Sequence, residues 1–246
     1  MRVVAIVPAA GLGVRMAGGR PAQGAAPPKQ LLDLEGLPIL FWTLRKLAAC
    51  TRLQQLIVAV RRPDRAAVEV RLAQEAYAGR VSVVEGGGSR QESVANALRR
   101  VAMDTELVLV HDAVRPFVAP ALLERALDAA TATGAAILGL PASDTVKQVE
   151  PAAGGHASRI TTTIPRERIV LAQTPQVFRA DWLREAFARA SADGFHGSDE
   201  AVLVERLGHP VTVVMGSERN IKITTPADLE LARFLLAQEQ TPGREE

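Results

Sequence analysis

Apolar runs rich in β-branched residues alternate with amphipathic stretches through the first half of the chain, and this alternation constrains the fold more than any other feature. The runs predict strands at residues 2–8, 53–60, 80–87, 106–112 and 135–141. The intervening stretches predict helices at residues 38–50, 62–76, 90–102 and 119–134. Strands that are apolar throughout and separated by helices are typical of a mostly parallel sheet with helices on both faces. We therefore expect one Rossmann-like α/β domain spanning residues 1–246.

The pattern breaks between about residues 142 and 173. Two polar, β-rich segments flank the turn-like sequence EPAAGGH there and offer little apolar surface for a core. We expect a protruding β-arm that lies against the domain or reaches a partner chain. The remaining expected elements are helices at 179–194 and 198–208, strands at 210–216 and 220–225, and a last helix from Pro226.

Composition excludes several classes of function. Hydrophobic residues make up 48% and charged residues 23% of the chain, as in soluble globular domains. No apolar stretch approaches the roughly 20 residues that a membrane-spanning helix needs. A net charge of +2 and only 4% aromatic residues argue against nucleic-acid binding. The single cysteine, Cys50, excludes an internal disulfide and favours a cytoplasmic location.

The glycine-rich sequence VPAAGLGVRM follows the first expected strand. Ligands of open α/β sheets bind outside the carboxyl ends of the strands. There, Gly11 and Gly13 would let backbone N–H groups approach an anion beside Arg15. The loop is no P-loop, because no Gly-Lys-Ser/Thr follows, and Met16 spoils a dinucleotide fingerprint. A purely structural turn stays open, but Lys29, which a long segment brings back to the same loop, favours a phosphate site.

A second glycine run, Gly86 to Gly88, also sits at an expected strand end, with Ser93 in the first turn of the next helix. Its backbone could form hydrogen bonds with a flat base edge or a ribose. Taken alone, the run favours a structural turn over a binding site.

Two further loops carry charged residues. In HDAVRP, Asp112 follows a buried strand and Arg115 comes three residues later. Asp112 is either a metal or ribose ligand or an internally paired carboxylate, and His111 is expected to be structural. Lys222 falls in a late expected strand, as a further candidate cation or as an exposed edge residue.

Taken together, these motifs resemble one family, the 2-C-methyl-D-erythritol 4-phosphate cytidylyltransferases. The resemblance covers nearly the whole chain. It rests on PAAGLGVRM…PKQ, GGGSRQESV, HDAVRP, DTVK, RERIVLAQTPQVF, SDEA and NIKIT. Each motif is weak alone, but seven in this order are highly specific. The resemblance implies a nucleotidyltransferase fold.

The resemblance also implies roles for individual residues. The predicted transition-state stabilising pair is Arg15 and Lys29. The predicted nucleotide-binding residues are Ala9, Ala10, Gly11, Gly13, Gly87, Gly88, Ser93 and Asp112. The predicted residues around the sugar-alcohol phosphate are Asp112, Arg115, Thr145, Arg166, Ser198 and Lys222. Within that set Arg166 and Lys222 would orient the attacking phosphate, and Asp112 is the candidate ligand of Mg²⁺.

The implied reaction joins CTP to 2-C-methyl-D-erythritol 4-phosphate, with Mg²⁺ as cofactor and pyrophosphate as the second product. The implied assembly is a homodimer formed through the β-arm, in which Arg166 serves the partner's site. Ribitol-5-phosphate cytidylyltransferase is the nearest alternative, although that family more often has Ser where this chain has Ala113. An NAD-dependent oxidoreductase and an inactive nucleotide-binding regulator are more distant alternatives.

Overall fold

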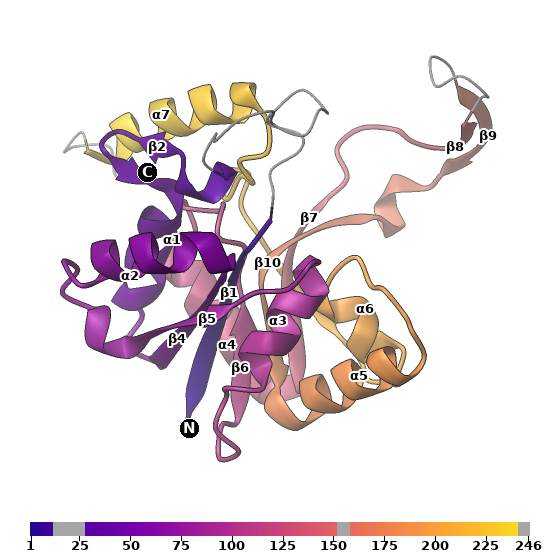
Figure 1. Cartoon of the computed structure of the whole chain (residues 1–246). Helices are drawn as coiled ribbons and strands as arrows, with labels where there is room; N and C mark the ends of the chain where they lie inside the picture. Colours follow the sequence, from indigo (N-terminus) through magenta and orange to yellow (C-terminus); the bar gives the residue numbers. More distant parts are fainter. Residues whose placement is uncertain (12–27, 152–157, 241–246) are drawn as a thin grey trace.

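The apolar runs form a seven-stranded sheet at the centre of the molecule (Figure 1). The computed structural model describes residues 1–11, 28–151 and 158–240. Within these ranges the strands of the sheet are β1 (Val3–Ala9), β4 (Leu53–Val60), β5 (Val81–Glu85), β6 (Leu107–Val110), β7 (Ala135–Pro141), β10 (Val170–Arg179) and β11 (Thr212–Met215). Their spatial order is β11-β7-β10-β6-β1-β4-β5.

The sheet is mostly parallel, as predicted. The neighbouring pairs β1/β4, β1/β6, β4/β5 and β7/β11 are all parallel. Only β10 runs antiparallel to both of its neighbours, β6 and β7. This strand was predicted only in part: residues 170–173 were assigned to the β-rich arm, residues 174–178 to no element, and Arg179 to the helix that follows.

Helices cover both faces of the sheet, which confirms the predicted layers. On one face lie α1 (Ile39–Ala49), α2 (Arg65–Leu72) and α4 (Pro120–Thr133). On the other lie α3 (Arg90–Leu98), α5 (Ala180–Ala192) and α6 (Glu200–Glu205). A last helix, α7 (Pro226–Gln240), contacts the small hairpin of β2 (Asp33–Leu34) and β3 (Leu37–Pro38). Short 3₁₀ turns are η2 (Lys29–Leu31), η3 (Arg62–Asp64), η4 (Ala78–Arg80) and η5 (Arg166–Arg168).

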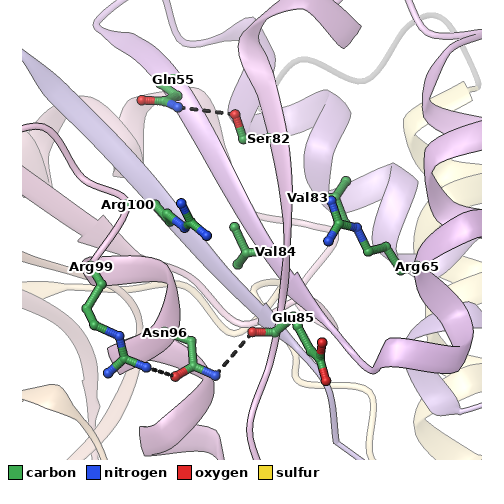
Figure 2. Close-up of a pocket in the computed structure, with 9 residues that line it drawn as sticks. All are labelled: Gln55, Arg65, Ser82, Val83, Val84, Glu85, Asn96, Arg99 and Arg100. Carbon is green, nitrogen blue, oxygen red and sulfur yellow. Dashed lines mark hydrogen bonds between the residues drawn. The ribbon is translucent and has the colours of Figure 1, made fainter.

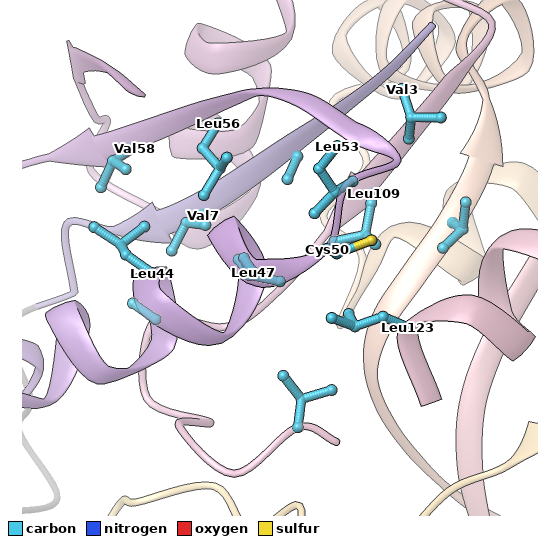
Figure 3. Close-up of a cluster of buried hydrophobic side chains, with 14 of the residues drawn as sticks. Val3, Val7, Leu44, Leu47, Cys50, Leu53, Leu56, Val58, Leu109 and Leu123 are labelled. Atoms are coloured by element: carbon cyan, nitrogen blue, oxygen red, sulfur yellow. The ribbon is translucent and has the colours of Figure 1, made fainter. Parts of the chain in front are cut away.

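Alternation along each strand divides the core into two layers. Val3 and Val7 of β1 point into a cluster with α1 and α4, part of which Figure 3 shows. Val4 and Ile6 point into a second cluster, with α3 and α5. Successive strand side chains face opposite sides, so a strand that is apolar at every position is buried on both. This is why the continuous apolar runs are a reliable signal in this chain.

The predicted arm is present as a two-stranded antiparallel hairpin, β8 (Val146–Pro151) with β9 (Ser158–Ile164). It projects from the body of the molecule beyond β7 and β10 (Figure 1). Its described side chains in β9 are almost all exposed, as expected for a polar segment without a core. In the described ranges no helix is both long and apolar enough to cross a membrane.

The expected strand at residues 220–225 is wrong. The segment is irregular, and among the described residues its backbone meets the backbone of the chain beyond residues 217–229 through the hydrogen bond from the Ile223 amide to the carbonyl of Val114. Ile223 is fully buried against α7, while the side-chain amide of Asn220 donates to the carbonyl of Thr174 at 2.8 Å. The alternation of polar and apolar residues therefore reflects side-chain anchoring rather than a strand.

Candidate functional site

A cavity of about 210 Å³ opens at the carboxyl ends of β1 and β6. This is the edge at which ligands of α/β sheets bind. Its lining residues are Pro8, Ala9, Ala10, Gly11, Lys29, Gln30, Arg90, Ser93, Asp112, Ala113, Val114 and Lys222. All four loops singled out in the sequence thus contribute to one cavity, the last of them through Lys222.

The first loop leaves β1 at Ala9 and is tied back by Gln30. The buried side-chain amide of Gln30 donates to the carbonyl of Ala9 at 2.5 Å and to that of Gly11 at 3.2 Å. Gln30 follows Lys29 in the 3₁₀ turn η2, so the same anchor holds Lys29 at the cavity. The predicted residues Gly13 and Arg15 lie outside the described residues.

The second loop closes against the first. A Cβ on Gly86 would lie 2.5 Å from the Cβ of Ala10, so only glycine permits this approach. The Ser93 hydroxyl accepts from the Gly87 amide at 3.1 Å and donates to the Ser89 carbonyl at 2.8 Å. Ser93 therefore lines the cavity while holding the glycine run in place.

The amides of the glycine run are used within the loop. Besides the Gly87 amide, that of Gly88 donates to the Glu92 carboxylate at 2.7 Å. Ser89 caps α3 by accepting from the Glu92 amide at 3.0 Å. Gly87 and Gly88 do not line the cavity, so their predicted contact with cytosine stays a prediction.

Asp112 is the centre of a buried ion cluster. Its Oδ1 lies 3.0 Å from Nε of Arg90, and its Oδ2 lies 2.7 Å from Nζ of Lys222 and 3.6 Å from Nε of Arg115. Arg90 continues through Nη1 to both carboxylate oxygens of Glu200, at 2.7 and 2.8 Å. Of the two alternatives that the sequence left open, Asp112 is therefore an internally paired carboxylate in this structure rather than a free ligand of a metal or a ribose.

The cluster carries more positive than negative charge. Three cations face the two carboxylates of Asp112 and Glu200, and Lys29 adds a further cation at the cavity. Burial opposes ionisation of Asp112, but Arg90 and Lys222 lower its pKa far below the ordinary range. Burial raises the pKa of Glu200, with Arg90 acting against this shift. Such a cavity suits a polyanion.

Arg115 is held beneath this cluster rather than in the cavity lining. Its Nη1 donates to the carbonyl of Asn220 at 2.6 Å, while its Nε has no hydrogen-bond partner among the described residues. Burial lowers the pKa of Arg115. Its charge therefore depends on Asp112 for compensation.

His111 is structural, as expected. It is fully buried, and burial lowers its pKa to about 4, so the ring is neutral at physiological pH. Its Nε2 lies 3.0 Å from the Arg115 carbonyl, and its Nδ1 lies 3.1 Å from the Thr174 hydroxyl. That hydroxyl also accepts from the Asp112 amide at 3.0 Å. The ring and Thr174 together fix the backbone that carries Asp112.

Three predicted substrate residues lie away from the cavity. Thr145 and Arg166 are exposed at the base of the arm, where Arg166 donates to the carbonyl of Ser143 at 2.7 Å. Ser198 is exposed just before α6. None of them lines the cavity within this one chain.

Three residues of the site were not assigned a role from the sequence: Gln30, Arg90 and Glu200. All three stand inside quoted motifs, PKQ, GGGSRQESV and SDEA. In the sequence each is a polar residue in a 3₁₀ turn or in the first turn of a helix. Such residues are common on protein surfaces, so the sequence does not mark them as part of a site. Only the fold brings them to Ala9 and Asp112.

A larger hollow of about 910 Å³ lies elsewhere, beside the outer edge of β5 (Figure 2). Its polar side chains form hydrogen bonds within the same lining: Gln55 donates to the Ser82 hydroxyl at 3.3 Å, and Asn96 donates to the backbone carbonyl of Glu85 at 3.1 Å. The lining contains none of the residues predicted for the site. We therefore place the candidate site in the smaller cavity.

Comparison with known proteins identifies the family of the chain. The family model described as IspD, 2-C-methyl-D-erythritol 4-phosphate cytidylyltransferase, matches residues 3–238. Proteins of that name from Acidobacterium capsulatum and Solibacter usitatus are 55% and 52% identical, over 97% of this chain and 98% and 97% of their own lengths.

Solved structures show the same fold. The cytidylyltransferase of that name from Thermus thermophilus is 37% identical, with a TM-score of 0.73 over 96% of this chain and all of its own. The 4-diphosphocytidyl-2C-methyl-D-erythritol synthase from Anaerococcus prevotii is 27% identical, with a TM-score of 0.80 over 96% of this chain and 98% of its own. The chain therefore belongs to the 2-C-methyl-D-erythritol 4-phosphate cytidylyltransferase family.

Proposed function

We propose that this enzyme transfers the cytidylyl group of CTP to 2-C-methyl-D-erythritol 4-phosphate. The products are 4-diphosphocytidyl-2-C-methyl-D-erythritol, an intermediate of non-mevalonate isoprenoid biosynthesis, and pyrophosphate. One observation carries the proposal at the site: Lys29, Arg90 and Lys222 converge on a cavity at the carboxyl edge of the sheet. Family membership supplies the nature of the two substrates.

The proposed reaction is a displacement at the α-phosphorus of CTP. An oxygen of the methylerythritol phosphate forms a new bond to that phosphorus, while the bond from the α-phosphorus to the bridging oxygen breaks and pyrophosphate leaves. The attacking phosphate is already anionic at neutral pH. No general base is therefore needed, which agrees with the state of His111: it is buried outside the cavity lining, neutral, and held by two internal partners.

The residues of this chain contribute positioned positive charge. Two polyanions must meet, and negative charge grows on the α-phosphate and the leaving group in the transition state. Cations fixed in advance lower both barriers. Lys29, anchored through its neighbour Gln30, is assigned to the triphosphate, and Lys222 to the attacking phosphate. Arg15, which lies outside the described residues, stays assigned with Lys29 to stabilising the transition state, as the resemblance implies.

A resident metal ion does not fit the described residues. Within them, no three His, Cys, Asp or Glu side chains form a group that could hold a metal. Both oxygens of Asp112, the predicted ligand, contact cationic side chains. We propose instead that Mg²⁺ enters with the CTP phosphates, as part of the substrate.

The active assembly proposed here is a homodimer joined through the arm. The hairpin exposes Val149 and Ile160, and Leu171 is exposed at its base. Arg166, at the same base, does not line the cavity of its own chain. A second copy that packs against the arm would cover the apolar residues and receive Arg166. The reaction is placed in the cytoplasm, where the buried thiol of Cys50 stays reduced.

The test is a matrix of pyrophosphate-release assays. CTP and UTP are each paired with 2-C-methyl-D-erythritol 4-phosphate and with ribitol 5-phosphate. We expect turnover with CTP and methylerythritol phosphate, and a marked loss with UTP, because a base edge with the wrong donor leaves a buried polar group unpaired. Equal use of UTP would contradict the proposed base recognition, and a preference for ribitol 5-phosphate would assign the alternative function.

A further inference from the structure

The ion pair between Arg90 and Glu200 extends from the cavity lining into the protein interior, and the reaction described above assigns no role to Glu200. Arg90 is the first residue of α3, and Glu200 is the first residue of α6. Only 1% of the Glu200 side chain is exposed, and Glu200 does not line the cavity. Arg90 does line it, and it also contacts Asp112.

The burial of the Glu200 carboxylate is energetically costly and therefore suggests a specific role for this residue. Removing it from water costs several kcal/mol, and an apolar side chain of similar size is often at least as stable in its place. The carboxylate of Glu200 faces one guanidinium nitrogen, Nη1 of Arg90, with both oxygens. Because a guanidinium is planar and rigid, this contact also sets the direction of Nε, which meets Asp112 at 3.0 Å.

The chain of contacts continues to the cavity. With Oδ1 of Asp112 held by Arg90, its Oδ2 is directed at Nζ of Lys222 at 2.7 Å. We propose that Glu200 is a positioning residue: through Arg90 it orients Asp112, and so places Arg90 and Lys222 for the phosphates of the substrates. The identity of the substrates in this inference rests on the proposed function, whereas the contacts among Glu200, Arg90, Asp112 and Lys222 do not depend on it.

Positioning and simple charge predict effects of opposite sign. Glu200→Gln removes a negative charge beside the cluster, so an electrostatic role alone would strengthen binding of an anion. A positioning role predicts the reverse, because the amide of Gln turns one donor toward Nη1 of Arg90 and displaces the guanidinium. We expect roughly tenfold weaker binding of pyrophosphate and a kcat for CTP lowered by a similar factor, the size of one lost charge-assisted hydrogen bond.

A double-mutant cycle with Arg90→Lys tests whether Glu200 acts through Arg90. The ammonium of lysine cannot span both carboxylates, so Arg90→Lys alone breaks the relay. In that background Glu200→Gln should change pyrophosphate affinity and kcat by less than about twofold, because coupled residues are non-additive. Equal effects in both backgrounds would overturn the inference, as would unchanged or tighter pyrophosphate binding in Glu200→Gln alone.

Asp199→Asn is the matched control. Asp199 caps α6 by accepting from the Val202 amide at 3.1 Å, and it does not touch Arg90. Because Asn caps helices about as well as Asp, this variant should leave the melting temperature, pyrophosphate affinity and kcat nearly unchanged. If Glu200→Gln does not fold, Glu200→Asp takes its place in the cycle. Calorimetry with pyrophosphate separates the positioning role of Glu200 from the proposed function. If the wild-type protein shows no turnover, the proposed function is refuted, but the pyrophosphate affinities of the wild type and the Glu200 variants still test the positioning role.

Discussion

Replacing Asp112 by Asn should destabilise the fold strongly, because this buried carboxylate contacts three cations and is the partner of the buried Arg115. Asp112 is 6% exposed and Arg115 is 8% exposed. Among the ion pairs of the described residues, Asp112 is the carboxylate within reach of Arg115, at 3.6 Å. The substitution keeps the side-chain shape and removes the charge, so Arg115 is left buried without compensation.

The magnitude follows from the burial of the cluster. Breaking a buried pair by removing one partner costs about 3–5 kcal/mol. For a domain of this size each kcal/mol corresponds to about 2–4 °C, so the melting temperature should fall by roughly 6–20 °C. Calorimetry and urea unfolding at pH 7 both measure this loss.

Asp128→Asn provides the comparison at the surface. Asp128 lies 2.6 Å from Arg52, but its side chain is 72% exposed. An exposed pair contributes about 0–1 kcal/mol, so this variant should unfold within a few degrees of the wild type. If Asp112→Asn were no more destabilised than Asp128→Asn, the argument that Asp112 compensates buried charge would be refuted.

Three further predictions concern catalysis, assembly and pH. Lys29→Ala should lower kcat by about 10²–10³-fold, because its charge is needed most where negative charge grows; unchanged kcat with raised KM would show a role in binding alone. Arg15→Ala and Arg166→Ala subunits, both inactive, should recover activity when exchanged into mixed dimers, since one site then keeps both arginines; verified exchange without recovery would place Arg166 in its own chain's site. For His111, a pKa of about 4 in the fold against about 6.5 unfolded means that stability is complete above pH 6.5 and declines as pH falls toward 4, by up to roughly 3 kcal/mol. The free energy of unfolding, measured by urea titration at several pH values in this range, should fall more steeply with decreasing pH in the wild type than in His111→Gln; an equal pH dependence would contradict the neutral buried ring.

Much of the fold could be predicted from the sequence because its central strands are buried on both faces. Val3 to Val7, for example, feed two different core layers, so nearly every position is apolar. The inner part of β10 was not predicted because its sequence does not resemble a central strand. It contains Pro175, which argues against a central strand, and the register shifts between Gln173 and Gln176 accommodate it.

The candidate site could be predicted only in part. The loops that follow β1 and β6 are visible in the sequence, because glycine and charged residues there interrupt apolar runs. Contacts across the sequence are not: Arg90 and Glu200 are 110 residues apart, and each looks like an ordinary first-turn residue. The sequence located Asp112 at the end of a buried strand, whereas the fold was required to show which residues surround it.

The position of the arm on β10 restricts where this chain tolerates insertions and deletions. The outer half of β10 leads out to the arm, while Val177 and Phe178 in its inner half enter opposite core layers. Side chains alternate with a period of two, so shifting this strand by one residue would exchange the two layers. Length changes in the arm must therefore be absorbed before Val170, and homologous chains that differ in arm length should keep the spacing from Thr174 to Phe178 constant.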